Sequence, residues 1–339
     1  SVGDTSKTYK GPAKHHVARV RAEVEAYLQV RTRDLPVRAD GKPMTELYQG
    51  IFEAWVAMSG DPDYHVPVWL KEGTPTGIER EPEDAGIFPR VDQGVEEKER
   101  RPLIFGGETF LNYRSFEDSA DAADLLGELV TSGYVEEFAS EGDAQAAAGG
   151  NPLVTSKLAL ITTMKDGVVK HRMILDCRVS GTNDHATKVE RVILPSPWDV
   201  VHDTLMMKAH VWKKDKAYSG ERRGEIFRLF VCDFKDAFFK LPLLGIERRY
   251  YVIKYRGRFY LCCRLVQGSI NGPSCFGRLS SLVGRMSQSL FDSTELRIQV
   301  YTDDPCCVMR GSAAYCDRMA ATLVLFWLVL GWDLSYHKA

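Results

Sequence analysis

The segment Leu296-Arg-Ile-Gln-Val-Tyr-Thr-Asp-Asp-Pro-Cys-Cys-Val-Met309 places two adjacent acids, Asp303 and Asp304, between two apolar runs. Apolar runs on both sides of turn residues predict two strands, with the acids at the tip of a hairpin. Asp is common in turns, so a hairpin tip without chemistry is the simplest interpretation of this segment alone. A third acid upstream changes that interpretation.

The third acid is Asp233, which follows a run over residues 226–232 that predicts a strand buried on both faces. A carboxylate at this strand end, beside the pair at the hairpin tip, could bridge two divalent cations. Two cations about 3.5–4 Å apart stabilise the attacking and leaving oxygens in phosphoryl transfer. Because no His or Cys stands at these three positions, we expect Mg²⁺, with Mn²⁺ as the second candidate.

Five segments of the chain, in this order, resemble the motif series of the reverse transcriptases of retrotransposons and retroviruses. A single short motif is weak, but five in one order with plausible spacings are specific. The resemblance covers about residues 115–339, and its motifs lie at residues 165–183, 233–242, 265–276, 301–304 and 330–338.

This resemblance implies an α+β fold: the fingers and palm of a right-hand polymerase, with an antiparallel palm sheet covered on one face by helices and the thumb absent. Residues 111–195 would form the fingers and residues 196–339 the palm, with a fingers insertion near residues 242–272. Residues 1–110 would be an N-terminal helical and linker region of unknown role. The family's thumb and RNase H would lie beyond residue 339, so we expect the chain to be a segment of a longer polyprotein.

The resemblance also implies a catalytic centre. Asp233 and Asp303 would be the main metal ligands, together with the backbone carbonyl of Phe234, and Asp304 would lie close by. Lys338 matches a lysine that gives a proton to the departing pyrophosphate in this family.

A nucleotide site follows from the same motifs. Arg172, with Lys165 or Lys170, would hold the incoming triphosphate, because a guanidinium fork matches phosphate oxygens and an ammonium adds a point charge. The resemblance places the backbone amides of Asp236 and Ala237 near the phosphates. This arrangement predicts a site for the charged end of a nucleotide.

Two further residues would hold the rest of the nucleotide. Gln267 would position it, and Phe238 matches the aromatic residue under the sugar, whose ring leaves no space for a 2′-hydroxyl. The resemblance therefore favours deoxynucleotides and a DNA product.

These residues also have structural interpretations. Arg172 alternates with apolar residues, which is typical of the exposed face of a strand. Phe238 could be a core aromatic, Gln267 a loop residue before a helix, and Lys338 a solvated lysine. Their common order with the three acids favours the functional interpretation.

Charge is distributed unevenly along the chain. Residues 1–150 carry 16 Lys and Arg against 28 Asp and Glu, and the remainder carries 28 against 18, although the net charge is only -2. Basic clusters at residues 213–216, 222–223, 248–249 and 254–258 are interleaved with Tyr250, Tyr251, Tyr255 and Tyr260. Such segments suit an RNA or DNA template-primer, through phosphate contacts and base stacking. The alternative is a set of solvated basic loops.

The eight cysteines show no paired C-x-x-C spacing for a zinc site, so we expect reduced, mostly buried thiols in an intracellular protein. We expect no membrane association, because the apolar run over residues 320–330 has 11 residues, short of the roughly 20 that span a bilayer. It predicts a buried helix.

Periodicity and turn residues predict the local structure. We expect helices near residues 13–30, 45–58, 119–132, 197–209, 273–289 and 313–330, and strands near residues 156–164, 170–178, 226–232, 250–254 and 258–263. Asp166-Gly167 favours a hairpin between the first two strands. Residues 60–95, with ten Pro and Gly, predict a loop or a poorly ordered linker without a site, and residues 142–150 a flexible loop.

Together these patterns predict an RNA-directed DNA polymerase fragment that uses deoxynucleoside triphosphates. A degenerate retroelement remnant, acting only as a nucleic-acid-binding or structural module, is the alternative. Pro305 supports that alternative, because it follows the two acids directly and cannot donate a hydrogen bond to a sheet. An RNA-synthesising relative is a third interpretation, which Phe238 disfavours.

Overall fold

The structure is a computed structural model that describes residues 11–30, 37, 41, 43–91, 100–105, 111–165, 167–214 and 225–335. Helices and small antiparallel sheets alternate along the chain, which confirms an α+β fold. The helices are α1 (Lys14–Leu28), α2 (Gln49–Ser59), α3 (His65–Glu72), α4 (Arg114–Glu117), α5 (Ala122–Ser132), α6 (Glu141–Ala147), α7 (Thr182–His185), α8 (Pro197–Lys214), α9 (Gly272–Gln288) and α10 (Ala313–Leu330). Two 3₁₀ turns span Ala237–Lys240 and Gly245–Tyr250.

The described strands form three antiparallel sheets, whose orders are β1-β6-β5, β2-β3 and β4-β8-β7. Their bounds are β1 (Val135–Phe138), β2 (Lys157–Lys165), β3 (Val168–Asp176), β4 (Ile226–Val231), β5 (Val252–Tyr255), β6 (Arg258–Cys262), β7 (Leu296–Tyr301) and β8 (Asp304–Gly311). The predicted strands are confirmed to within a few residues. The β2-β3 hairpin forms where Asp166-Gly167 predicts it.

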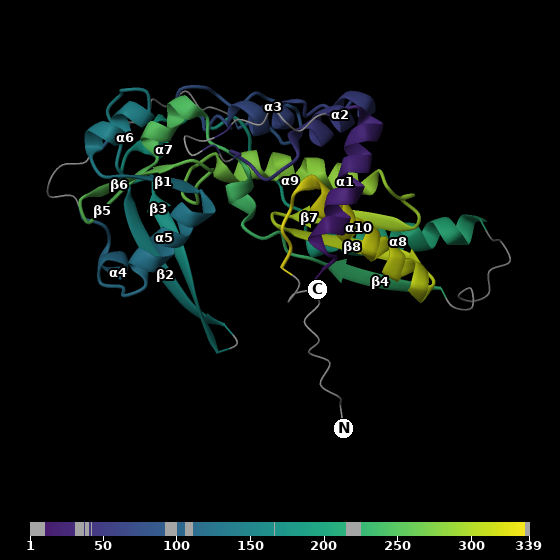
Figure 1. Cartoon of the computed structure of the whole chain (residues 1–339). Helices are drawn as coiled ribbons and strands as arrows, with labels where there is room; N and C mark the ends of the chain where they lie inside the picture. Colours follow the sequence, from purple (N-terminus) through teal and green to yellow (C-terminus); the bar gives the residue numbers. More distant parts are fainter. Residues whose placement is uncertain are drawn as a thin grey trace.

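Figure 1 shows the sheets in two lobes, with α9 near the middle. The β2-β3 hairpin, α4, α5, α6 and the sheet β1-β6-β5 lie in one lobe, and the sheet β4-β8-β7 with α1, α8 and α10 lies in the other. One hydrophobic core contains residues from both lobes, from Leu126 and Leu158 to Leu279 and Trp327. The two lobes are therefore packed as a single body.

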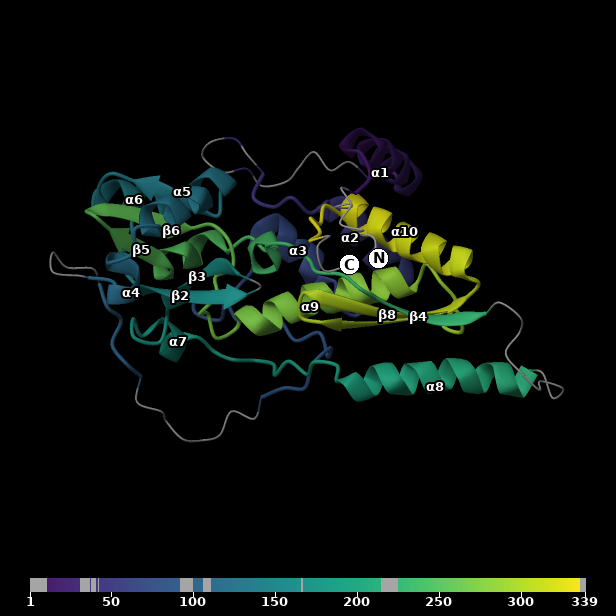
Figure 2. The ribbon, with the colours of Figure 1, turned by 90° about the horizontal axis from the view of Figure 1, so that it is seen from below.

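Helices lie on both faces of the sheet β4-β8-β7, although the sequence predicts them on one face only. Helices α9 and α10 cover one face and α8 lies along the other (Figure 2). Asp203 of α8, which is 6% exposed, accepts hydrogen bonds from Arg297 at 3.1 Å and from Gln299 at 2.7 Å. These alternate residues of β7 share one face of the strand, which is why α8 packs there.

The prediction of a loop or linker is only partly right for residues 60–91, because residues 65–72 form a helix while residues 73–91 have no regular secondary structure. Helix α3 begins at His65, and its Trp69 and Leu70 are fully buried. The sequence does not predict this helix, because Pro67 suggests a loop. In the structure this proline stands in the first turn, where a helix tolerates it. Nearby, the buried Glu247 accepts hydrogen bonds from the backbone of residues 76–80, which fixes the segment after α3.

The predicted flexible loop at residues 142–150 is also partly wrong. Residues 141–147 form α6, whose first turn is capped by Ser140, because its hydroxyl accepts the N–H of Asp143 at 3.1 Å. The alanines in this segment favour a helix more than the flanking glycines oppose it.

The cysteines are mostly buried, as the sequence predicts, and the apolar run over residues 320–330 lies in a helix that, at 18 residues, is longer than the run itself. All eight cysteines are free, and seven of them are buried. Within the described residues, α10 is the one helix that is long and apolar enough to span a membrane. Its Leu323, Trp327 and Leu330 are fully buried, and α10 packs on β4 and β8 as a core helix.

Candidate active site

The predicted acids lie on adjoining strand ends. Strands β7 and β8 pair as far as Tyr301 and Asp304, which leaves a two-residue turn of Thr302 and Asp303. The end of β4 continues along this turn, because Phe234 donates its N–H to the carbonyl of Asp303 at 2.9 Å. Asp233, 70 positions upstream, is therefore a close backbone neighbour of the Asp303 turn.

Pro305 does not prevent this hairpin. It occupies the second position of β8, opposite Val300, and its carbonyl accepts the N–H of Cys232 at 3.2 Å. A proline near a strand end loses one donor but keeps its acceptor. The acceptor is the group that joins β8 to the end of β4 here.

The acids do not form a complete metal cage on their own. Within the described residues, no group of three His, Cys, Asp or Glu side chains is arranged to hold a metal ion. Asp233, Asp303 and Asp304 are all half-buried. Mg²⁺ is usually bound by one or two carboxylates, with substrate phosphates and water completing its shell. The chemistry of this donor set therefore fits Mg²⁺ together with a phosphate ligand.

Phe234 holds the strand end in place. Its side chain is 2% exposed and stacks on Trp332 with ring centres 4.3 Å apart, while Trp327 meets it edge-on at 5.3 Å. Its ring therefore belongs to the core, and its backbone N–H is the group that contacts the Asp303 turn.

A cavity of about 460 Å³ opens next to the hairpin turn. Six predicted site residues line it, and they come from four segments far apart in sequence: Arg172 from β3, Asp236, Ala237 and Phe238 from the turn after β4, Gln267 from the loop before α9, and Asp303. Of the other predicted nucleotide ligands, Lys170 is exposed on β3 and does not line the cavity. The side chain of Lys165 and all of Lys338 lie outside the described residues.

The floor of this cavity is rigid. Phe238 stacks on the fully buried Phe276 of α9 with ring centres 4.9 Å apart. Phe239 stacks on Tyr134 with ring centres 4.3 Å apart and an interplanar angle of 10°. Two neighbouring aromatic rings are thus fixed by partners from different elements.

Two residues of the cavity wall have unusual backbone conformations. Only four non-glycine residues in the described part of the chain have a positive φ, and two of these, Asp236 (φ 53°) and Thr302 (φ 56°), line this cavity. For a β-branched residue such as Thr302 this conformation is a true outlier. Such conformations cluster at functional sites, where the surrounding structure holds them.

Some residues of this site are not predicted from the sequence. Thr302 lines the cavity, and the only signal for it is its place between Tyr301 and the acids. Tyr134 donates a hydrogen bond from its hydroxyl to Asp236 at 3.2 Å. Burial and the nearby charge of Asp236 raise the pKa of Tyr134 above its usual range. No sequence pattern connects these two residues.

Where the structure describes the basic clusters, the tyrosines between them belong to the core. Tyr250, Tyr251, Tyr255 and Tyr260 are at most 7% exposed, so the expectation that they stack on bases is wrong. The arginines of these segments also pair with acids of the protein: Arg248 with Glu136, Arg249 with Glu79 and Arg258 with Glu137.

No protein-family model matches the sequence, and no curated protein sequence matches it. Among solved structures, the chain is similar to the native crystal structure of the Prototype Foamy Virus protease-reverse transcriptase, with a TM-score of 0.44 and 15% sequence identity. The superposition covers 72% of this chain and 26% of that chain, so this chain spans about a quarter of the viral protein's length.

Proposed function

We propose that the chain is the fingers and palm part of a reverse transcriptase from a retroelement. It would add deoxynucleotides to the 3′-hydroxyl of a primer on an RNA template. The observation that carries this proposal is the 460 Å³ cavity, whose wall joins residues of four motif segments. The pairing of β5 and β6 with β1 supports grouping residues 242–272 with the fingers.

The wall of the cavity supplies groups for a triphosphate and a sugar. The exposed guanidinium of Arg172 can grip phosphate oxygens in a bidentate manner. The left-handed turn at Asp236 would offer the amides of Asp236 and Ala237 to the same phosphates. Phe238, packed on Phe276, is the rigid surface that would exclude a ribose 2′-hydroxyl.

Asp233 and Asp303, with the carbonyl of Phe234, would hold Mg²⁺ or Mn²⁺, and Asp304 lies next to them. When bound, the metal would offset the negative charge of the phosphates and stabilise the oxygens that carry charge in the transition state. Two observations support this role: Asp303 lines the nucleotide cavity, and the backbone bond from Phe234 to Asp303 holds the strand end that carries Asp233 next to the hairpin turn.

The reaction joins the primer 3′-oxygen to the α-phosphorus and breaks the bond to the β-phosphate, which releases pyrophosphate. Arg172 would keep the triphosphate in line for this attack. Lys338, the expected proton donor to pyrophosphate, stays a prediction, because it lies outside the described residues.

Primer extension on an RNA template with Mg²⁺ and deoxynucleotides, by a version of the chain with its thumb restored, tests the proposal. We expect Asp303→Asn to lower extension by about 100-fold or more, since metal stabilisation of a transition state amounts to several kcal/mol. Asp317→Asn is the matched control, because Asp317 pairs with Arg228 at the surface and does not line the cavity. Equal extension by the parent and by Asp303→Asn would refute the metal assignment.

The same assay tests the choice of sugar. In Phe238→Ala we expect ribonucleotides to be used at a rate closer to that of deoxynucleotides, because the ring beneath the sugar is gone. If the parent already uses both kinds of nucleotide equally, the chain is an RNA-synthesising relative instead.

A degenerate remnant that only binds RNA remains the second candidate. The lack of a three-residue metal group within the described part of the chain favours it. This candidate predicts RNA binding that is indifferent to Mg²⁺ and nucleotide. Titration of labelled RNA with and without both compounds separates the two candidates.

A further inference from the structure

Tyr134 is held firmly between α5 and β6. Its N–H donates to the carbonyl of Leu129 at 2.9 Å, which closes the end of α5, and its carbonyl accepts the N–H of Cys263 at 2.9 Å. The stacked ring of Phe239 fixes its side chain. The hydroxyl of Tyr134 therefore occupies a defined position, set by three separate contacts.

That hydroxyl reaches a carboxylate in the wall of the nucleotide cavity. It donates to Oδ2 of Asp236 at 3.2 Å, and Lys235 stands 4.0 Å from the same oxygen. Asp236 also lines a second cavity of about 320 Å³, together with Tyr134 and Arg172. Asp236 thus belongs to a wall that both cavities share, whereas Tyr134 lines only the second cavity and Thr302 and Asp303 line only the first.

A carboxylate that was free to turn into the cavity at this position would repel the negatively charged triphosphate. Like charges in contact cost free energy, and the cost is larger where solvent is partly excluded. The 3₁₀ turn that follows Asp236 also depends on a left-handed backbone conformation at Asp236, which is unfavourable for a non-glycine residue. A hydrogen bond from a fixed partner offsets both effects.

We propose that Tyr134 is a positioning residue for the nucleotide, because it retains the Asp236 carboxylate on the far side of the shared wall. Asp236 and Ala237 then keep the turn in which they line the cavity, and the carboxylate stays away from the phosphates. This inference rests on the proposed function, since it assigns the cavity to a triphosphate.

Calorimetric titration with a deoxynucleoside triphosphate and Mg²⁺ tests the inference. Tyr134→Phe removes only the hydroxyl and keeps the stacked ring. We expect the affinity to fall about 10-fold, which corresponds to the loss of one hydrogen bond to a charged group. Adding Asp236→Asn to this variant is expected to restore most of the affinity, because the repelling charge is gone.

Tyr315→Phe is the matched control. Its hydroxyl donates to a carboxylate of Glu295 at 2.7 Å, and neither residue lines the two cavities. We expect this variant to bind the nucleotide like the parent. Melting temperatures of all variants show whether a change in affinity comes with a change in stability.

The outcomes separate this inference from the proposed function. If the parent binds the nucleotide and Tyr134→Phe binds it equally well, the positioning role is refuted while the proposed function stands. The role is refuted as well if Asp236→Asn fails to restore affinity, because a purely structural tyrosine would give that result. If the parent does not bind the nucleotide with Mg²⁺, the proposed function and this inference both fall.

Discussion

At the scale of single residues, Gly268 is the described glycine at which an added Cβ would meet the closest atom. Its φ is +127°, and a Cβ built there would lie 2.0 Å from the carbonyl oxygen of Leu175 in β3. Asn183 adds a hydrogen bond from its side-chain amide to the Gly268 carbonyl at 2.8 Å. Gly268 therefore sets the distance between β3, which carries Arg172, and the loop that carries Gln267.

We expect Gly268→Ala to destabilise the protein by roughly 2–6 kcal/mol, the sum of about 1–3 kcal/mol for backbone strain and about 1–3 kcal/mol for steric overlap. Gly150→Ala is the control, because Gly150 also has a positive φ but, among the described residues, no atom lies within 4 Å of the place that a Cβ would occupy. We expect a cost of about 1–2 kcal/mol there. Urea unfolding measures both, and equal costs would contradict the tight contact.

The residues of the site differ in how far the sequence predicts them. Arg172, Phe238 and Gln267 belong to motif segments, and the structure brings them to one cavity. Tyr134 meets Asp236 across 102 positions, so no local pattern connects the two. A positive φ at Asp236 is also beyond local prediction, because tertiary contacts hold it.

At the scale of elements, local patterns predict well where they are strong. The Asp-Gly turn predicts the β2-β3 hairpin, and apolar periodicity predicts α9 and α10. Local patterns do not predict helix α3, because its burial depends on a partner that is distant in sequence. Trp69 lies beneath the guanidinium of Arg278, 4.3 Å from the ring centre, and Arg278 belongs to α9. A side chain more than 200 positions away thus stabilises a segment that looks like a linker.

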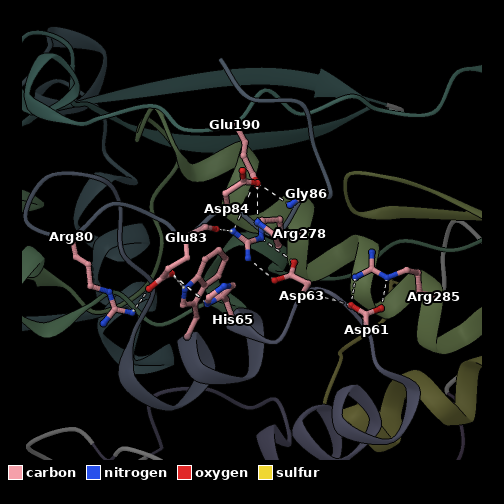
Figure 3. Close-up of polar contacts among 12 residues, drawn as sticks. Asp61, Asp63, His65, Arg80, Glu83, Asp84, Gly86, Glu190, Arg278 and Arg285 are labelled. Atoms are coloured by element: carbon pink, nitrogen blue, oxygen red, sulfur yellow. Dashed lines mark hydrogen bonds and ion pairs between the residues drawn. The ribbon is translucent and has the colours of Figure 1, made fainter. Parts of the chain in front are cut away.

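The contact between this segment and α9 is a buried ion pair. Figure 3 shows Arg278 facing Asp63, and the guanidinium donates to both carboxylate oxygens, at 2.9 and 2.5 Å. Arg278 is 1% exposed and Asp63 is fully buried. Nearby, Arg285 of α9 binds Asp61 in the same bidentate manner, at 2.6 and 2.9 Å.

We expect Asp63→Ala to lower the free energy of unfolding by about 3–5 kcal/mol, because it leaves the Arg278 charge buried without its main partner. Asp317→Ala is the control, since its pair with Arg228 is exposed and is worth about 0–1 kcal/mol. Thermal unfolding of the two variants measures the difference. Similar melting temperatures would show that residues 61–91 are not integral to the fold.

At the scale of the whole molecule, the uneven charge of the sequence has an internal explanation. Acids from the first 150 residues pair with arginines from the remainder, and these pairs are Glu46–Arg264, Asp61–Arg285, Asp63–Arg278, Glu79–Arg249, Glu136–Arg248 and Glu137–Arg258. The first 150 residues thus supply acidic partners for six arginines of the region that carries the motifs. Composition alone cannot distinguish such pairing from a nucleic-acid surface, because it contains no information on partners.

We propose that one cavity, built from distant motif segments, holds a metal-bound deoxynucleotide. Arg172 lines this cavity, whereas Arg178, also exposed and at the end of the same hairpin, does not. The two arginines therefore form a matched pair of variants for a binding measurement on the whole chain.

The most direct measurement is isothermal titration of the chain with a deoxynucleoside triphosphate, with and without Mg²⁺. We expect saturable binding that requires Mg²⁺, that weakens by about 10-fold or more in Arg172→Ala through the loss of a charged bidentate contact, and that is unchanged in Arg178→Ala. Binding that ignores Mg²⁺, or an Arg172→Ala variant that binds like the parent, would contradict the account.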